Sequence, residues 1–161
     1  MSRHVTAPAL HPEAAQLTDE IRHQLERRAF LAANELRNAS QLVLRGQRHG
    51  RRYKVPGTYA RRKDRTTGKV RRGRYYTASA PGEAPALRTG AFRLSWRPTG
   101  LVNGRSYISR IESDLQTENG GHTLGEILEE GTSRMEPRPY QDRILEKAER
   151  PILRIYNEPY F

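Results

Sequence analysis

The side chains best suited to chemistry lie in one short stretch, where His122 is followed by Glu126, Glu129 and Glu130. Histidines and carboxylates transfer protons and bind metal ions, so this group would be the start of an acid–base or metal site. The chain has no paired-histidine zinc motif and no phosphate-cradling loop, and it offers no Ser, His and acid arrangement. The Gly-Gly pair before His122 indicates a turn. We therefore expect no catalytic residue, no metal site and no cofactor.

Composition narrows the function classes further. The 161 residues contain no cysteine, which removes disulfides, thiolate nucleophiles and cysteine-based zinc sites and fits a protein made in a reducing cytosol. No apolar run is long enough to cross a bilayer, and the first residues lack the apolar core of a secretory signal. We expect a soluble protein with one core, and the low apolar fraction of 35% places part of the chain outside it.

The positive charge is concentrated in one segment. Of the net charge of +11, residues 45–74 supply thirteen Lys and Arg against one acid, Asp64, which is +12 and leaves −1 for the rest. This pattern predicts a near-neutral domain with one basic arm, which is either solvated, bound to an acidic neighbouring protein, or in contact with DNA. The candidate contact residues are Arg52, Arg61, Arg62, Lys63, Arg65, Lys69, Arg71, Arg72 and Arg74. Tyrosines are interleaved with them (Tyr53, Tyr59, Tyr75 and Tyr76), as in many protein interfaces and nucleic-acid surfaces.

A long helix is the strongest structural signal. Thr18 is a plausible N-cap, with Asp19 and Glu20 in the first turn. Apolar residues then recur at steps of three and four, which predicts about seven turns ending near Gly46 and packed on a sheet. That stripe consists of Ile21, Leu25, Ala29 (or Arg28), Ala32, Leu36, Ala39 and Val43. Residues 1–16 would form an N-terminal arm, and residues 17–161 a single domain.

The basic segment itself indicates a hairpin. Two extended runs, 52–63 and 69–79, flank the turn sequence Asp64-Arg-Thr-Thr-Gly68. We expect residues 45–78 to be a basic extended insertion. An isolated two-stranded hairpin is marginal in water, so the arm would need a partner to order it.

The second half of the chain predicts three strands and a final helix. The strands are 91–98, with Phe92, Leu94 and Trp96 on one face, then 107–113, and then 124–130, which would end at Gly131. Pro98-Thr-Gly100 and Asn119-Gly-Gly121 separate them as turns. The last helix would begin at Pro139 and bury Ile144, Leu145, Ala148 and Ile152. The expected fold is α+β: a long N-terminal helix and a C-terminal helix packed on a mainly antiparallel sheet, with a protruding basic β-hairpin.

Two loop motifs carry a resemblance to a known family. The loop motif is Pro81, Gly82, Pro85, Thr89 and Gly90, and the turn motif is Glu129, Gly131, Thr132, Arg138 and Pro139, followed by Tyr140. In this order and separation, downstream of a long helix, they resemble the Hong Kong 97 gene-product-ten family of tail-completion and head–tail joining proteins of long-tailed phages. The resemblance covers roughly residues 17–152. From the residues alone, Glu129 and Arg138 either form a bidentate ion pair or are separately solvated, and the resemblance favours the pair.

The resemblance implies a structural virion protein without chemistry. It would form a homo-oligomeric ring, expected to be a hexamer, at the head–tail junction through which DNA passes. Its partners would be neighbouring neck, connector and tail-tube proteins, with genomic DNA in the channel and no membrane, after synthesis in the host cytoplasm. The alternative is a stand-alone basic nucleic-acid-binding domain, whose duplex affinity would depend strongly on salt.

Overall fold

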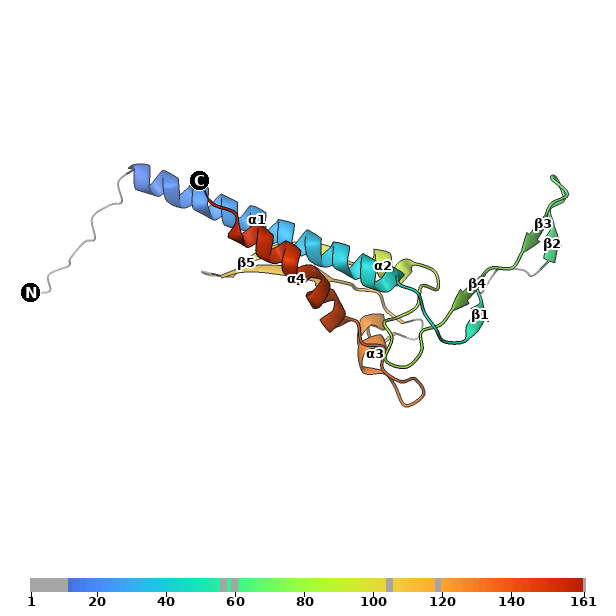
Figure 1. Ribbon diagram of the computed structural model, residues 1–161. Coiled ribbons are helices and arrows are strands. Elements are labelled where there is room, and N and C mark those ends of the chain that lie inside the picture. The colour runs from blue at the N-terminus through green and yellow to red at the C-terminus, as the bar shows by residue number, and fades with distance from the viewer. Residues whose placement is uncertain (1–11, 56–57, 59–60, 104–105, 118–119, 161) are drawn as a thin grey trace, which may run out of the picture.

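One helix runs the length of the body, and the other elements pack along it. The computed structural model describes residues 12–55, 58, 61–103, 106–117 and 120–160. The first element is the 34-residue helix α1 (Pro12–Arg45). The others are β1 (Arg52–Lys54), β2 (Arg61–Lys63), β3 (Val70–Arg72), β4 (Tyr75–Thr77), α2 (Ala91–Leu94), β5 (Arg97–Asn103), β6 (Ser106–Glu112), α3 (Leu124–Glu130) and α4 (Gln141–Asn157). The fold is α+β as predicted, and Figure 1 shows α4 antiparallel to α1.

Helix α1 begins six residues before the predicted cap at Thr18. Proline suits the first position of a helix, and the alanines that follow Pro12 favour helix, so nothing in the sequence stops the helix from extending upstream. Residues 12–16 of the predicted N-terminal arm are therefore helical, and residues 1–11 lie outside the described part of the chain.

The core lies where α1 meets α4. Alanines at four positions of α1 are buried, and their small side chains let the neighbouring elements approach closely. The buried cluster consists of Leu36, Ala39, Leu44, Ala84, Tyr140, Ile144 and Ala148. The prediction for α4 is confirmed at Ile144 and Ala148 and wrong at Leu145, whose side chain is 59% exposed. Each residue turns a helix by 100°, so the residue after Ile144 leaves the buried face.

Arg28 of α1 joins that helix to the C-terminal end of α4. Its guanidinium donates to the carbonyl oxygens of Tyr156 at 3.3 Å and Pro159 at 2.8 Å, and it lies 3.9 Å from the ring centroid of Tyr160. A buried cation at the C-terminal end of a helix satisfies free carbonyls and complements the helix dipole.

Strands β5 and β6 form an antiparallel ribbon against α1. Gly100 pairs with Ser109 in the register, and the Ser109 hydroxyl donates to the carbonyl of Ala29 at 2.9 Å. A Cβ on Gly100 would lie 3.0 Å from the backbone nitrogen of Phe30, so glycine allows the close approach of ribbon and helix. The predicted turn at Pro98-Thr-Gly100 is wrong, because all three residues lie inside β5, and the strand predicted at 107–113 is confirmed within a residue.

The strand predicted at 91–98 is helical over 91–94 and extended only at 97–98, and the strand predicted at 124–130 is a helix. Residues 91–94 form α2, in which Phe92 packs on the core while Leu94 is exposed. Phe92 and Trp96 are four residues apart, a spacing that fits one face of a helical turn as well as one face of a strand. Residues 124–130 form α3, which begins with a capping box: the Thr123 hydroxyl accepts from the backbone N–H of Glu126 at 3.3 Å, and the Glu126 carboxylate accepts from that of Thr123 at 3.1 Å.

The basic segment forms an antiparallel hairpin in two successive parts. Strand β1 pairs with β4, and β2 pairs with β3. At the tip, the Asp64 carboxylate accepts the backbone N–H groups of Thr66 at 2.9 Å and Thr67 at 3.1 Å, as the turn sequence predicts. Figure 1 shows the arm leaving the body beyond the C-terminal end of α1. The side chains of Arg61, Arg62, Arg71 and Arg72, together with Tyr59 and Asn119, lie outside the described part.

None of the described helices combines the length and the apolar character needed to cross a membrane.

Candidate functional site

Three residues of the loop motif and one residue of the turn motif line the same pocket. Its volume is about 470 Å³, and its walls come from the end of α1, the loop before α2, α3 and the loop before α4. Pro85, Thr89 and Gly90 line it from the loop motif, and Arg138 lines it from the turn motif. The other walls are mostly apolar: Leu44, Leu87, Phe92, Leu115, Leu124, Leu128 and Met135. The fold therefore brings together two motifs that are about forty residues apart in the sequence.

Two glycines shape the loop motif. Gly90 has φ +90° and is the N-cap of α2, and beside it the Thr89 hydroxyl accepts the N–H of Ala91 at 3.3 Å. Gly82 donates its N–H to the carbonyl of Pro137 at 3.3 Å and accepts from Arg143 at 2.7 Å, so it joins the loop motif to the turn motif and to α4. Thr89 and Gly90 therefore belong to the bend that leads into α2.

Gly131 ends α3 in a conformation reserved for glycine. Its φ is +80° and its ψ is −168°, a region that other residues essentially do not occupy. After it, Thr132 and Met135 exchange backbone hydrogen bonds of 2.8 and 3.2 Å, and Arg138 donates its N–H to the carbonyl of Leu128 at 2.7 Å. The predicted end of this element at Gly131 is confirmed, although the element is a helix and not a strand.

The predicted ion pair between Glu129 and Arg138 is not formed, although the structure describes both residues. The Glu129 carboxylate instead accepts the backbone N–H groups of Tyr140 at 3.0 Å and Gln141 at 3.4 Å. A carboxylate at a helix start satisfies free N–H groups and complements the dipole, so the N-terminus of α4 competes successfully with Arg138. The cap residue of α4 is Tyr140, so Pro139 precedes the helix and does not occupy its first position.

Tyr140 packs against Phe92, which lines the pocket. Its side chain is buried, its hydroxyl donates to the carbonyl of Gly125 at 3.2 Å, and its ring lies edge-on to Phe92 and Trp96 at centroid distances of 5.5 and 5.9 Å. Burial, together with the nearby Glu129 carboxylate, raises the pKa of Tyr140 to about 12. The hydroxyl therefore stays protonated and acts as a structural donor.

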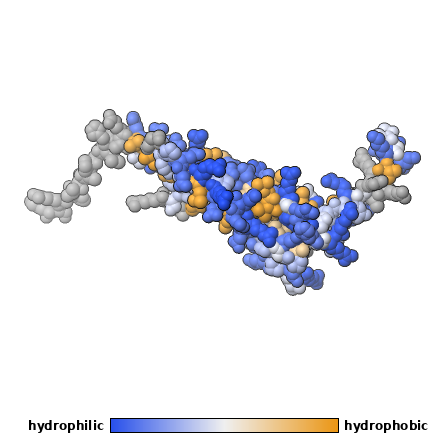
Figure 2. Space-filling view, viewed as in Figure 1, coloured by the Kyte–Doolittle hydropathy of each residue, from blue (hydrophilic) through white to orange (hydrophobic). Residues whose placement is uncertain are grey.

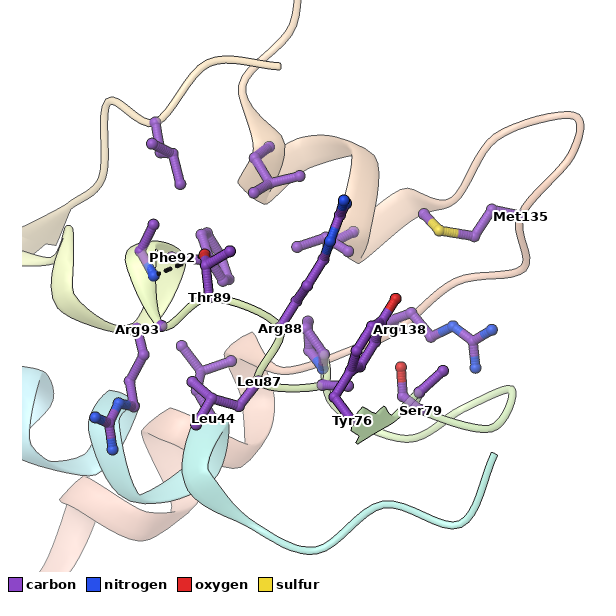
Figure 3. Close-up of a pocket in the computed structure, with 18 residues that line it drawn as sticks. Leu44, Tyr76, Ser79, Leu87, Arg88, Thr89, Phe92, Arg93, Met135 and Arg138 are labelled. Atoms are coloured by element: carbon purple, nitrogen blue, oxygen red, sulfur yellow. Dashed lines mark hydrogen bonds between the residues drawn. The ribbon is translucent and has the colours of Figure 1, made fainter. Parts of the chain in front are cut away.

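Three arginines give the pocket its polarity. Figure 3 shows Arg93 and Arg138 on opposite sides of the apolar lining, with Arg88 between them. The Arg138 Nη1 and Arg93 Nε atoms are buried without a hydrogen-bond partner in the described part of the chain. An apolar pocket bordered by cations can bind an apolar side chain that carries or adjoins an anionic group.

The acid–base candidates do not form a site. Glu126 is engaged in the cap of α3, Glu129 caps α4, and His122 and Glu130 are exposed. Within the ranges that the structure describes, no three His, Asp or Glu side chains are grouped to hold a metal ion.

The basic arm carries its aromatic rings outward. Tyr53 stacks on Tyr76 at a centroid distance of 5.9 Å, and the Arg52 guanidinium lies 4.7 Å from the ring centroid of Tyr75. Tyr53 is nevertheless 44% exposed and Tyr75 51% exposed. Lys63, Arg65, Lys69 and Arg74 are exposed as well. The arm therefore presents cations together with apolar area.

Glu83 fastens the base of the arm to the loop motif. Its carboxylate accepts the backbone N–H of Ala80 at 2.8 Å and that of His49 at 3.1 Å, and it lies 2.6 Å from the His49 ring nitrogen Nδ1. These contacts, with Ala80 first, lower the pKa of the Glu83 carboxyl to about 2.

The low pKa of Glu83 predicts a loss of stability in acid. A carboxyl whose folded pKa is depressed contributes stability above its unfolded pKa, and this contribution disappears as the pH falls through the folded pKa. Between pH 4.5 and about 2, we expect the free energy of unfolding to fall more steeply for the wild type than for Glu83→Gln. Denaturant unfolding at a series of pH values measures both. Parallel pH profiles would contradict the prediction.

Comparisons with protein-family models, with curated proteins and with solved structures find no match to this chain.

Proposed function

We propose that this chain is a structural virion protein of a tailed phage, which assembles into a ring at the head–tail junction through which DNA passes. The order of the loop and turn motifs supports the proposal, as does their meeting at one pocket. The expected ring is a hexamer, and its neighbours would be neck, connector and tail-tube proteins. The subunit would be made in the host cytoplasm and would seal the joint by assembly alone.

The projecting arm is the observation that carries the proposal. Its strands pair only with one another in the described chain, and its cations repel one another. A two-stranded ribbon is marginal in water unless something packs against it. Because the body of the same subunit leaves Tyr53, Tyr75 and Val70 exposed, an assembled neighbour would supply the missing contacts.

The charge of the arm favours a second candidate, a stand-alone nucleic-acid-binding domain. The +12 of residues 45–74 would attract phosphates, and the interleaved tyrosines would stack on bases. We favour the ring because a DNA channel must let its cargo slide. Thirteen cations per subunit that gripped phosphates would resist sliding.

Removing the arm distinguishes a role in assembly from a role in DNA binding. Arg51 and Ala78 are joined by a backbone hydrogen bond of 2.9 Å, so an Asn-Gly turn can replace residues 52–77 and close the chain between them. We expect the shortened protein to fold, to lose the ability to join heads to tails, and to change little in duplex binding. Circular dichroism checks the fold, and in vitro joining and titration with duplex DNA check the rest.

A tip variant with Lys63, Arg65 and Lys69 changed to Gln is the matched control, because it keeps the arm and removes only exposed charge. It should still join heads to tails. Normal joining by the shortened protein, with its duplex affinity abolished, would show that the arm serves DNA.

A further inference from the structure

We propose that the arm of one subunit docks on the exposed stripe of α4 in a second copy of this chain. The stripe consists of Asp142, Leu145, Glu146, Glu149 and Leu153. The inference deepens the proposed function by naming the partner of the arm, and it rests on that function only in requiring that the chain assembles.

The stripe is one continuous face of the helix. From Asp142 its members follow at steps of three, four, seven and eleven residues, which places them within about 100° of one another around the axis. All five are exposed, and the two leucines are 59% and 52% exposed. The core-facing side of α4 carries Ile144 and Ala148, so packing inside the subunit does not use the stripe. Two large apolar side chains beside three carboxylates call for a partner that is both apolar and cationic.

The charges of α4 lie on two adjacent faces, which meet at Glu146, three residues after Arg143 and four before Arg150. The carboxylates Asp142 and Glu146 are four residues apart, and Glu149 follows three residues later, so like charges face one another. In the part of the chain that the structure describes, none of these three carboxylates forms an ion pair. The cations of α4 lie on the adjacent face: Arg143, Lys147, Arg150 and Arg154. A cationic partner would offset the repulsion within the stripe.

The arm has the complementary chemistry. Arg52 and Lys54 lie on the same face of the β1–β4 ribbon as Tyr75, because side chains alternate along a strand and Lys54 is paired with Tyr75. All three are exposed, and the Arg52 guanidinium lies 4.7 Å from the ring centroid of Tyr75, which supplies apolar area. Figure 2 shows hydrophobic patches on the mainly hydrophilic helical body and a mostly hydrophilic arm. The stripe covers about 16 Å at 1.5 Å per residue, which is the length of about five residues of strand. Strand β1 has three residues, or about 10 Å, so it can lie along about two thirds of the stripe.

The contact must be between subunits. Figure 1 shows the arm extending away from the body, while α4 runs back along α1 toward the other end. An arm that docks on a different surface of the next copy makes a heterologous contact, and repetition of such a contact closes into a ring when the rotation allows. A second copy is favoured over DNA because the same chain displays a face that matches both the cations Arg52 and Lys54 and the ring of Tyr75.

Charge exchange tests the contact directly in the full chain. The arm variant is Arg52→Glu with Lys54→Glu, two exposed cations on one face of the ribbon, and the stripe variant is Glu146→Lys with Glu149→Lys. Each alone should weaken association about tenfold or more, because like charges then face one another. A chain that carries all four changes should recover assembly. Sedimentation velocity measures the distribution of assembled species, and circular dichroism verifies the fold of each variant.

Lys147→Glu with Arg150→Glu reverses the adjacent face of the same helix and should leave assembly unchanged. A stripe variant that assembles like the wild type, or a four-change chain that stays apart, would overturn the docking and leave ring formation standing. A wild type that stays monomeric and binds duplex DNA through its arm would overturn both.

Discussion

Gly131→Ala is expected to destabilise the domain by about 3 kcal/mol, the largest effect of any single methyl group that we predict. Gly131 has φ +80° and ψ −168°, a combination that costs other residues about 1–3 kcal/mol. The new Cβ would also lie 2.6 Å from the carbonyl oxygen of Met135 and 2.9 Å from the nitrogen of Pro137. Both atoms belong to the backbone, so the clash cannot be relieved by turning a side chain.

Urea denaturation measures this loss, and Gly120→Ala is the matched control. Gly120 also has a positive φ, of +68°, but a Cβ there would meet nothing within 4 Å. The control should therefore lose only about 1 kcal/mol, the cost of the left-handed conformation alone. Equal losses in the two variants would show that the crossover after α3 is not tightly packed.

Glu129→Ala is expected to cost about 1–2 kcal/mol, and Arg138→Ala clearly less. Removal of the Glu129 carboxylate leaves the N–H groups of Tyr140 and Gln141 without their acceptor at the start of α4. Arg138 makes no ion pair with it, so the two substitutions should be additive within about 0.5 kcal/mol in a double-mutant cycle. Glu130→Ala, at an exposed neighbouring carboxylate, should stay within about 0.5 kcal/mol of the wild type. A coupling energy above about 1 kcal/mol between Glu129 and Arg138 would show that the two side chains interact in solution and would contradict the prediction.

Several elements of the fold could be predicted because each depends on a strong local sequence pattern. The apolar stripe of α1, the turn at Asp64, the strand that contains Tyr107 and the strained Gly131 are each specified by neighbouring residues. Such signals need no tertiary information.

The errors came from patterns that two structures satisfy equally. Phe92 and Trp96 suit a strand or a helical turn, and the structure uses the turn to bring both rings onto Tyr140. The apolar residues of the α3 segment predict a strand, although Thr123 and Glu126 have the spacing of a capping box, which is a helix signal. A glycine after Pro98 and Thr99 is typical of a turn. In the structure, Gly100 instead allows β5 to lie close to α1, and this contact exists only in the tertiary fold.

The residues of the candidate site could be predicted from the sequence, but the partner of the Glu129 carboxylate could not. Pro85, Thr89, Gly90 and Arg138 were identified from the two motifs, and the structure places them around one pocket. The partner of Glu129 could not be deduced, because a carboxylate can choose between a guanidinium and the free N–H groups of a helix start. That choice depends on where Tyr140 and α4 begin.

The central claim is that this chain is an assembly subunit, and electron microscopy of the purified protein tests it most directly. At physiological salt we expect closed rings of uniform subunit number, with a central channel wide enough for duplex DNA. The arm of each subunit should lie on its neighbour. Dispersed single subunits at the same concentration, which bind duplex DNA with an affinity that falls steeply as salt is raised, would contradict the account.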